Sequence, residues 1–165
     1  MTQPMIRLAH ADDAAAIAAI YNHYVLTSTI SFEEEPVSVN EMEQRIQDVG
    51  SRLPWYVYER DGAVIGYAYA TPWRVRSAYR FSVESTVYVA PDRPRQGIGS
   101  QLYRTLIEDL RTRGIQVMLG GIAQPNVASV RLHERLGFEK VAHFNRVGLK
   151  FEQWVDVGYW ELQLA

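Results

Sequence analysis

The stretch that decides the fold is SVESTVYVAPDRPRQGIGS, residues 82–100. Phe81 to Val89 is rich in β-branched and aromatic residues, which predicts a strand. From Gly99 to Arg113 leucines recur every four residues, which predicts a helix. The two glycines Gly97 and Gly99 therefore stand at the entrance of a helix that directly follows a strand.

Two glycines at a helix entrance allow backbone N–H groups to approach a bound anion, because no Cβ intervenes. The helix N-terminus adds about half a positive charge. The pattern therefore indicates a phosphate or pyrophosphate site. A P-loop would need a Gly-Lys-Ser/Thr ending and a dinucleotide fold would need GxGxxG, and this turn has neither. From the turn alone, a helix entrance that binds nothing is an equally good interpretation. The residues expected to hold the anion are Arg95, Gln96, Gly97, Ile98, Gly99 and Ser100.

Periodicity along the rest of the chain predicts the order β-α-α-β-β-β-α-β-α-β-β. Asp12 or Asp13 is expected to cap the first helix, and Ser38 with Glu41 forms a capping-box pattern for the second. An antiparallel meander is thus combined with two strand-helix-strand crossovers, which predicts a mixed sheet covered by helices. No linker or repeat is visible, so we expect one domain spanning residues 1–165. The expected strands are 5–9, 55–59, 63–73, 81–89, 117–122, 138–149 and 155–164, and the later helices are 40–49, 99–113 and 126–136.

The composition narrows the class of protein. A chain of 165 residues with 47% hydrophobic residues can bury a sizeable core without staples. The net charge of -2 argues against a nucleic-acid binder. With no cysteine, a cysteine nucleophile and a cysteine zinc site are excluded, and we expect no metal. The N-terminus shows no secretory signal and no stretch has the length of a membrane span, so we expect a cytoplasmic protein without a membrane partner.

A second motif, a short helix downstream of the glycine turn, helps to interpret that turn. Asn126 lies 27 residues beyond Gly99 and opens a short predicted helix, NVASVRLHERLGF. A glycine turn paired with such a helix resembles the GNAT superfamily of N-acetyltransferases. Further stretches resemble its phosphinothricin and methionine sulfone N-acetyltransferase group: NHYVLTSTISF, ATPWRVRSAYRFSVESTVYV, GSQLY, PNVASVRLHERLGF and FEQWVDVGYW. The resemblance covers nearly the whole chain.

This resemblance implies an α/β (α+β) fold with a mixed, mostly antiparallel seven-stranded sheet flanked by about four helices. It implies acetyl-CoA as cosubstrate, with its pyrophosphate on the turn and its pantetheine arm beside the strand before it, near Val87, Tyr88, Val89 and Asn126. Its thioester would lie where the two central strands separate. One departure is Pro94, which stands where the superfamily usually has Gln or Arg. We therefore expect backbone N–H groups to hold the pyrophosphate.

Amide formation requires a neutral amine and a proton for the departing thiolate. From the strand alone, Glu84 would be an exposed residue or a partner of Arg80, but it stands at the superfamily's base position and is our candidate base, directly or through one water. His133 stands where many members carry a tyrosine that protonates the sulfur, and a packed or solvent-facing histidine is the alternative. We expect direct attack of the amine in a ternary complex.

The candidate substrate residues are Phe32, Arg74, Arg76 and Tyr79. If the strand persists there, Arg74 and Arg76 share a face and can bind a carboxylate together with a phosphinate or sulfone group. A solvated basic loop is the alternative. Trp154, Tyr159 and Trp160 are expected to close the sheet or to line a dimer contact. The resemblance implies a homodimer and a small anionic amine substrate. A protein or peptide N-acetyltransferase and a non-catalytic acetyl-CoA sensor remain as alternatives.

Overall fold

The structure is a computed structural model that describes residues 2–93 and 96–165. The helices and strands follow the order predicted from the sequence, with two short 3₁₀ turns in addition, Ala11–Asp13 and Ser77–Tyr79. The strands are β1 Met5–Leu8, β2 Trp55–Arg60, β3 Ala63–Pro72, β4 Ser82–Val89, β5 Val117–Ala123, β6 Glu139–Lys150 and β7 Gln153–Gln163. The helices are α1 Ala14–Thr27, α2 Val39–Gly50, α3 Ile98–Thr112 and α4 Val127–Arg135.

Within the described ranges the strands form one seven-stranded sheet in the order β1-β2-β3-β4-β5-β7-β6. Every neighbouring pair is antiparallel except β4 and β5, which α3 connects as a parallel pair. The mixed, mostly antiparallel sheet with its four helices confirms the expected fold class.

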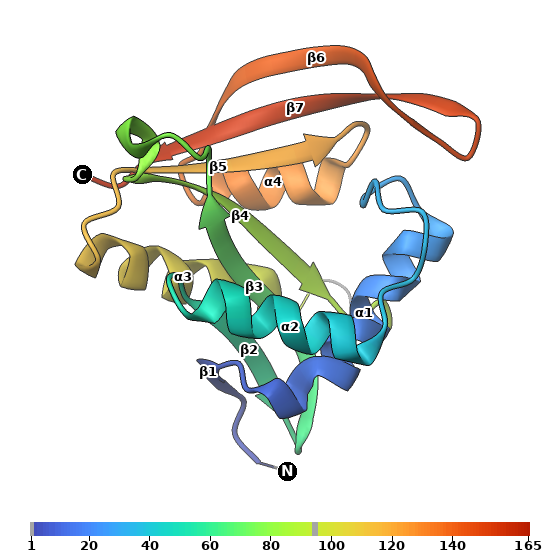
Figure 1. The fold of residues 1–165 in the computed structure, drawn as a ribbon, viewed down its shortest axis with the longest axis vertical. Helices are drawn as coiled ribbons and strands as arrows, with labels where there is room; N and C mark the ends of the chain where they lie inside the picture. The colour runs from blue at the N-terminus through green and yellow to red at the C-terminus, as the bar shows by residue number, and fades with distance from the viewer. Residues whose placement is uncertain (1, 94–95) are drawn as a thin grey trace.

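Helices cover both faces of the sheet (Figure 1). On one face α1 and α2 pack over β2 and β3, where Ile17, Met42 and Val57 lie in a common buried cluster. On the other face the leucines of α3, such as Leu102 and Leu106, pack against Ala68 and other strand residues. The helical spacing of four thus places one side of α3 on the sheet, as its periodicity predicted.

The central strands β4 and β5 separate along their length. They pair in parallel over three positions, from Ser82 opposite Val117 to Glu84 opposite Leu119. Beyond Glu84 the pairing stops, although β4 continues to Val89 and is paired with β3 from Val83 to Val89. Figure 1 shows the two strands spreading apart toward their C-terminal ends. This opening in the sheet positions the site described below.

The predicted cap of α2 is confirmed, and the predicted cap of α1 is wrong. The Ser38 hydroxyl accepts a hydrogen bond from the Glu41 N–H at 3.1 Å. Asp13 stands at the N-cap position of α1, but its side chain makes no cap bond. Its carboxylate instead accepts two hydrogen bonds from the Arg7 guanidinium, each of 2.9 Å. A charge-assisted bidentate pair with a strand residue thus replaces the local cap.

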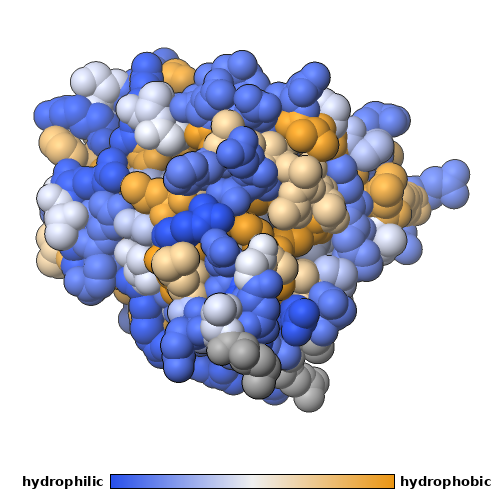
Figure 2. Space-filling model, turned by 90° about the horizontal axis from the view of Figure 1, so that it is seen from below, coloured by the Kyte–Doolittle hydropathy of each residue, from blue (hydrophilic) through white to orange (hydrophobic). Residues whose placement is uncertain are grey.

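The surface is mixed in character. The face shown in Figure 2 is largely hydrophilic, with hydrophobic residues in small patches between polar ones. No helix in residues 2–93 and 96–165 is long and apolar enough to cross a membrane.

Candidate active site

A cavity of about 310 Å³ fills the opening between β4 and β5. One wall comes from β4, which contributes the run from Glu84 to Tyr88, and the opposite wall comes from β5, with Gly121 to Ala123. The loop between α1 and α2 adds Phe32, and helix α4 adds His133. Four segments that are distant in the sequence therefore meet at one cavity.

Glu84 lies at the branching point of the two strands. It is the last β4 residue that pairs with β5, and its half-buried side chain lines the cavity. Burial raises the pKa of its carboxyl, while the positive charge of Arg74 opposes this effect in part. A carboxylate with a raised pKa next to a cavity has the properties of a proton acceptor near neutral pH.

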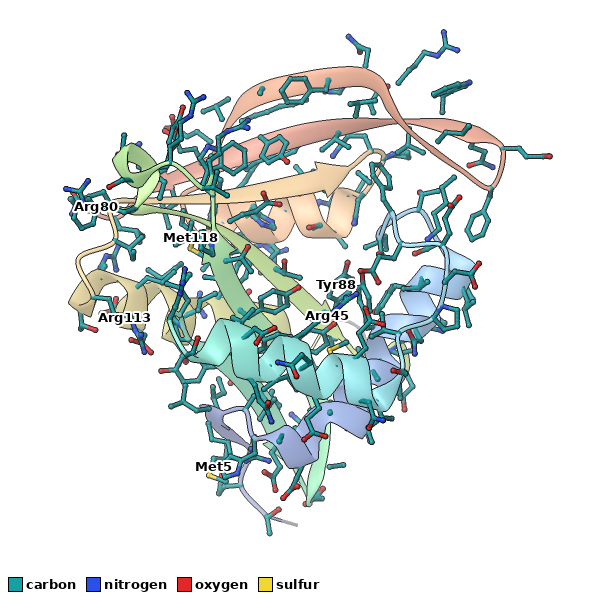
Figure 3. The ribbon with its side chains drawn as sticks, viewed as in Figure 1. Met5, Arg45, Arg80, Tyr88, Arg113 and Met118 are labelled. Atoms are coloured by element: carbon teal, nitrogen blue, oxygen red, sulfur yellow. The ribbon has the colours of Figure 1, made fainter. Side chains whose placement is uncertain are left out.

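The β4 residues on the same face as Glu84 form a wall of hydroxyl and aromatic groups. Thr86 and Tyr88 follow Glu84 at strand spacing, and both line the cavity. Tyr88, labelled in Figure 3, packs edge-on against Tyr21 of α1 with ring centroids 5.3 Å apart. Burial raises the pKa of Tyr21 to about 12, so its hydroxyl remains protonated at neutral pH. This face of the cavity is therefore polar and uncharged apart from Glu84.

His133 is enclosed on the opposite side of the cavity, with 3% of its surface exposed. Its Nδ1 lies 2.7 Å from the carbonyl oxygen of Ser129, a distance at which Nδ1–H donates. Nε2 is buried and has no hydrogen-bond partner among the described residues. Burial lowers the pKa of the imidazole, which the Ser129 carbonyl partly opposes. The ring packs against Tyr103 and Phe138, so it is both a packed residue and a cavity residue.

The two glycines of the turn stand at the entrance of α3, where the sequence predicted the start of a helix. Gly97 adopts φ +73°, the left-handed conformation that favours glycine, and stands at the N-cap of α3. A Cβ added at Gly99 would lie 3.2 Å from Cδ2 of Leu132 on α4, so this glycine also permits close packing of two helices. Gln96 accepts a hydrogen bond from Arg60 at 2.7 Å. Pro94 and the candidate Arg95 lie outside the described residues.

The remaining cofactor candidates divide into two groups. Val87, Tyr88 and Asn126 line the cavity, whereas Val89 does not, and the carbonyl of Val89 accepts a hydrogen bond from Tyr24. The Asn126 side chain caps α4 by accepting from the Ser129 N–H at 3.2 Å. In the turn itself Ile98 is buried in the core, with 2% of its surface exposed, and Ser100 is half-buried.

Of the substrate candidates, Phe32 lines the cavity. Arg74, Arg76 and Tyr79 lie exposed in the connection between β3 and β4, outside the cavity lining. Strand β3 ends at Pro72, so the premise that Arg74 and Arg76 share a strand face is wrong. Arg74 nevertheless lies near enough to lower the pKa of Glu84, and its guanidinium covers the Trp73 ring at 4.8 Å.

Several cavity residues were missed by the sequence analysis. Tyr159 was assigned to the sheet closure or a dimer contact, yet it lines the cavity beside Gly121, and Trp160 is buried in the core. Tyr103 and Ser85 line the cavity as well. The signal for Ser85 was its hydroxyl in an apolar strand position. Tyr103 and Tyr159 give no such signal, because buried aromatic residues are usual in a core.

Comparison with known proteins assigns the family. Residues 6–158 match the acetyltransferase (GNAT) domain. A phosphinothricin N-acetyltransferase of Streptomyces viridochromogenes is 43% identical over 156 residues, 94% of this chain and 85% of that protein. An L-methionine sulfoximine/L-methionine sulfone acetyltransferase of Salmonella typhimurium is 38% identical, over 96% of this chain and 94% of that protein. The structure of a phosphinothricin acetyltransferase from Sinorhizobium meliloti in complex with acetyl-CoA superimposes with a TM-score of 0.94 and 35% identity, covering 99% of this chain and 90% of that one.

The fold, the divergent strand pair and these matches define an acetyl-CoA-dependent N-acetyltransferase. The resemblance to the phosphinothricin and methionine sulfone group is thereby confirmed. The chain belongs to the GNAT acetyltransferase family.

Proposed function

We propose that this protein transfers the acetyl group of acetyl-CoA to the amino group of a small, anionic, amino-acid-like substrate of the phosphinothricin, methionine sulfone or methionine sulfoximine type. The observation that carries the proposal is the half-buried Glu84 carboxylate at the point where β4 and β5 separate. The names of the relatives, which match nearly the whole chain, support the substrate class.

The groups present suit acetyl-CoA. The C-terminal half of β4 lacks a partner on the β5 side, so backbone groups there are free to bond an extended chain such as a pantetheine arm. The N-terminus of α3 offers backbone N–H groups beside the left-handed Gly97 to a pyrophosphate. The residues proposed to hold acetyl-CoA are Val87, Tyr88, Val89, Arg95, Gln96, Gly97, Ile98, Gly99, Ser100 and Asn126.

When bound, acetyl-CoA supplies an acetyl thioester, and the protein residues manage the protons. Glu84 accepts a proton from the substrate ammonium, directly or through one water, and leaves the amine neutral for direct attack in a ternary complex. His133 is the proposed donor to the departing sulfur. Its Nδ1–H faces Ser129, so the donor would be Nε2 after protonation, although burial lowers the pKa of the ring. The attacking nitrogen loses a second proton as the amide forms, and this proton balances the one that Nε2 gives to the sulfur.

The substrate end of the cavity is proposed to lie between the loop carrying Phe32 and the β3–β4 connection. The aromatic ring of Phe32 covers the aliphatic part of the substrate, while Arg74 and Arg76 attract its anionic groups. Tyr79 is proposed as a further contact. The separation of Arg74 and Arg76 from the cavity lining suits charge attraction from the rim.

We also propose that the chain is a single N-acetyltransferase domain and forms a homodimer. One sheet with strands from residue 5 to residue 163 supports the single domain. Strand β6 is an edge of the sheet, and β6 with its hairpin exposes hydrophobic side chains, which favours association with a second copy. These side chains are Val141, Phe144, Val147, Leu149, Phe151 and Trp154.

The test is a screen for thioester consumption with acetyl-CoA over amines. The panel contains phosphinothricin, methionine sulfone, methionine sulfoximine, ordinary amino acids and short peptides. Turnover is expected to be fastest with the anionic amino-acid analogues. Preference for peptides would favour a protein N-acetyltransferase, and binding of acetyl-CoA without turnover of any amine would contradict the enzymatic proposal.

A further inference from the structure

Lys150 is a charged side chain that is enclosed by the protein. It ends strand β6, and only 1% of its surface is exposed. The ion pairs formed among the described residues do not include it. Burial lowers the pKa of its ammonium group, an effect that the carboxylates of Glu34 and Glu33 partly oppose. Since an enclosed ammonium loses its hydration, the contacts it makes in exchange are informative.

The Lys150 ammonium connects two distant segments of the chain. Its Nζ donates a hydrogen bond of 2.6 Å to the main-chain carbonyl oxygen of Ser31, 119 positions away. Ser31 lies in the connection between α1 and α2, residues 28–38, which we call the Phe32 loop. Figure 1 shows this loop rising beside α1 toward the hairpin of β6 and β7. Lys150 therefore fastens the Phe32 loop to that hairpin.

A second contact joins the same two segments. A Cβ added at Gly148 would lie 2.4 Å from Cε2 of Phe32, so the aromatic ring rests directly on the glycine backbone. Gly148 and Lys150 are two positions apart on β6. The hairpin thus contacts two consecutive residues of the loop, through the carbonyl of Ser31 and the ring of Phe32.

Both loop residues belong to the wall of the cavity. Ser31 and Phe32 line it on the side of α1, across from His133. The Ser31 hydroxyl lies 2.7 Å from the hydroxyl of Tyr21, another lining residue. The position of Ser31 is therefore fixed from two directions, by Tyr21 through its hydroxyl and by Lys150 through its carbonyl.

We propose that Lys150 is a positioning residue for the amine substrate, which acts by holding Ser31 and Phe32 in place as a wall of the cavity. Lys150 is not among the residues that line the cavity, so its effect on the reaction is transmitted through the Phe32 loop. The inference rests on the proposed function, because it assigns the Phe32 side of the cavity to the amine. Loosening this wall weakens amine binding and leaves the binding of acetyl-CoA intact.

The test is Lys150→Met, which matches the length of the lysine's aliphatic stem and removes its ammonium. The KM for the amine is expected to rise about tenfold, with kcat and the KM for acetyl-CoA changed by less than about twofold. A general loss of folded protein would lower the apparent kcat and leave both KM values unchanged. Equal changes in both KM values, or an unchanged KM for the amine, would overturn the proposal. If Lys150→Met does not fold, Lys150→Gln, whose amide nitrogen is uncharged and one bond closer to the backbone than Nζ, is measured for the same selective rise.

Lys140→Met is the matched control, because Lys140 is the other lysine of the chain and lies exposed on the same strand. It is expected to leave both KM values unchanged. Adding Lys150→Met to Phe32→Ala tests the route of the effect: the further rise in the amine KM should be less than about threefold, since the ring to be positioned is gone. A full additional tenfold rise would show that Lys150 does not act through Phe32.

The wild-type protein separates the two hypotheses. If it acetylates no amine, the proposed function fails before Lys150 is tested. If it acetylates an amine and Lys150→Met behaves as the wild type, only the positioning role is lost.

Discussion

The two halves of β4 are built from similar residues but have different neighbours. From Ser82 to Glu84 the strand pairs with β5, and Val83 and Glu84 pair with β3 as well. From Ser85 to Val89 it is paired with β3 alone, because β5 has turned away toward β7. The first half is an ordinary central strand. The second half, Ser85 to Val89, is an edge inside the sheet, and we call it the free half of β4.

An internal edge of this kind differs from an outer edge such as β1. At β1 the unpaired backbone groups face solvent, whereas the free half of β4 faces a cavity that β5, α4 and the Phe32 loop enclose. Unpaired backbone groups in such a place require a partner, and a bound ligand can supply it. Glu84 stands at the boundary between the two halves. Its backbone is held by the paired sheet, and its side chain lines the cavity.

The largest effect is expected at that boundary. Glu84→Gln preserves the shape of the side chain and removes its basicity, so kcat should fall by about 10²-fold or more. The affinity for acetyl-CoA should stay within about twofold, as measured by calorimetry. Glu161→Gln on β7, one strand beyond β5, is the control and should retain turnover. Wild-type turnover in Glu84→Gln would remove Glu84 as the base.

A large effect on acetyl-CoA affinity is expected at the N-terminus of α3, which follows the free half of β4. Gly99→Val places carbon atoms where a Cβ alone would lie 3.2 Å from Leu132, and it obstructs the approach of a phosphate to the α3 N-terminus. The Kd for acetyl-CoA should rise by about tenfold or more, equivalent to about 1.4 kcal/mol. Gly50→Val is the control, because no atom lies within 4 Å of the added Cβ. An unaltered Kd would refute the assignment of the turn.

A smaller effect is expected from the charge that faces Glu84. The Arg74 charge lowers the pKa of the Glu84 carboxyl, so Arg74→Ala should raise this pKa further. Since the base must be deprotonated, the acid limb of kcat/KM should move to higher pH, and activity should be lost earlier as the pH falls. The KM for anionic amines should also rise more than that for neutral amines. If the acid limb of Arg74→Ala stays at the wild-type pH, Arg74 does not influence the ionisation that controls activity.

The smallest effect on turnover is expected from the contact between helix α1 and the end of β4. The Tyr24 hydroxyl donates to the carbonyl of Val89, the last residue of β4. Tyr24→Phe removes this bond and should lower the free energy of unfolding by about 1 kcal/mol. Turnover should change little, as denaturant unfolding and steady-state rates would show. A loss of unfolding free energy above about 3 kcal/mol would contradict this, because it exceeds the net contribution of one hydrogen bond.

The sequence predicted the elements well because their signals are local. The leucine spacing of α3 and the Ser38 cap of α2 each act within a few residues. The same locality explains the errors. Asp13 is a good cap by type, but Arg7 on β1 binds it first. Arg7 is only six positions away, but it lies on a strand, and no capping rule pairs a strand arginine with a helix cap.

The candidate site could be predicted only in part, for a similar reason. Glu84 and Phe32 were selected with the help of the family resemblance, and both line the cavity. Tyr103 and Tyr159 reach the cavity because the sheet opens beside them, which no spacing reveals. The sequence analysis did not single out Lys150, since its partner Ser31 is 119 positions away.

The central claim is that the free half of β4 is the edge that binds acetyl-CoA. Amide hydrogen exchange, resolved by residue, tests it most directly with and without acetyl-CoA. Amides of Ser85 to Val89 that point away from β3 should exchange more slowly when acetyl-CoA is bound, and those of Ser82 to Glu84 should not change, because β5 already pairs with them. Unchanged exchange from Ser85 to Val89 under saturating acetyl-CoA would contradict the account.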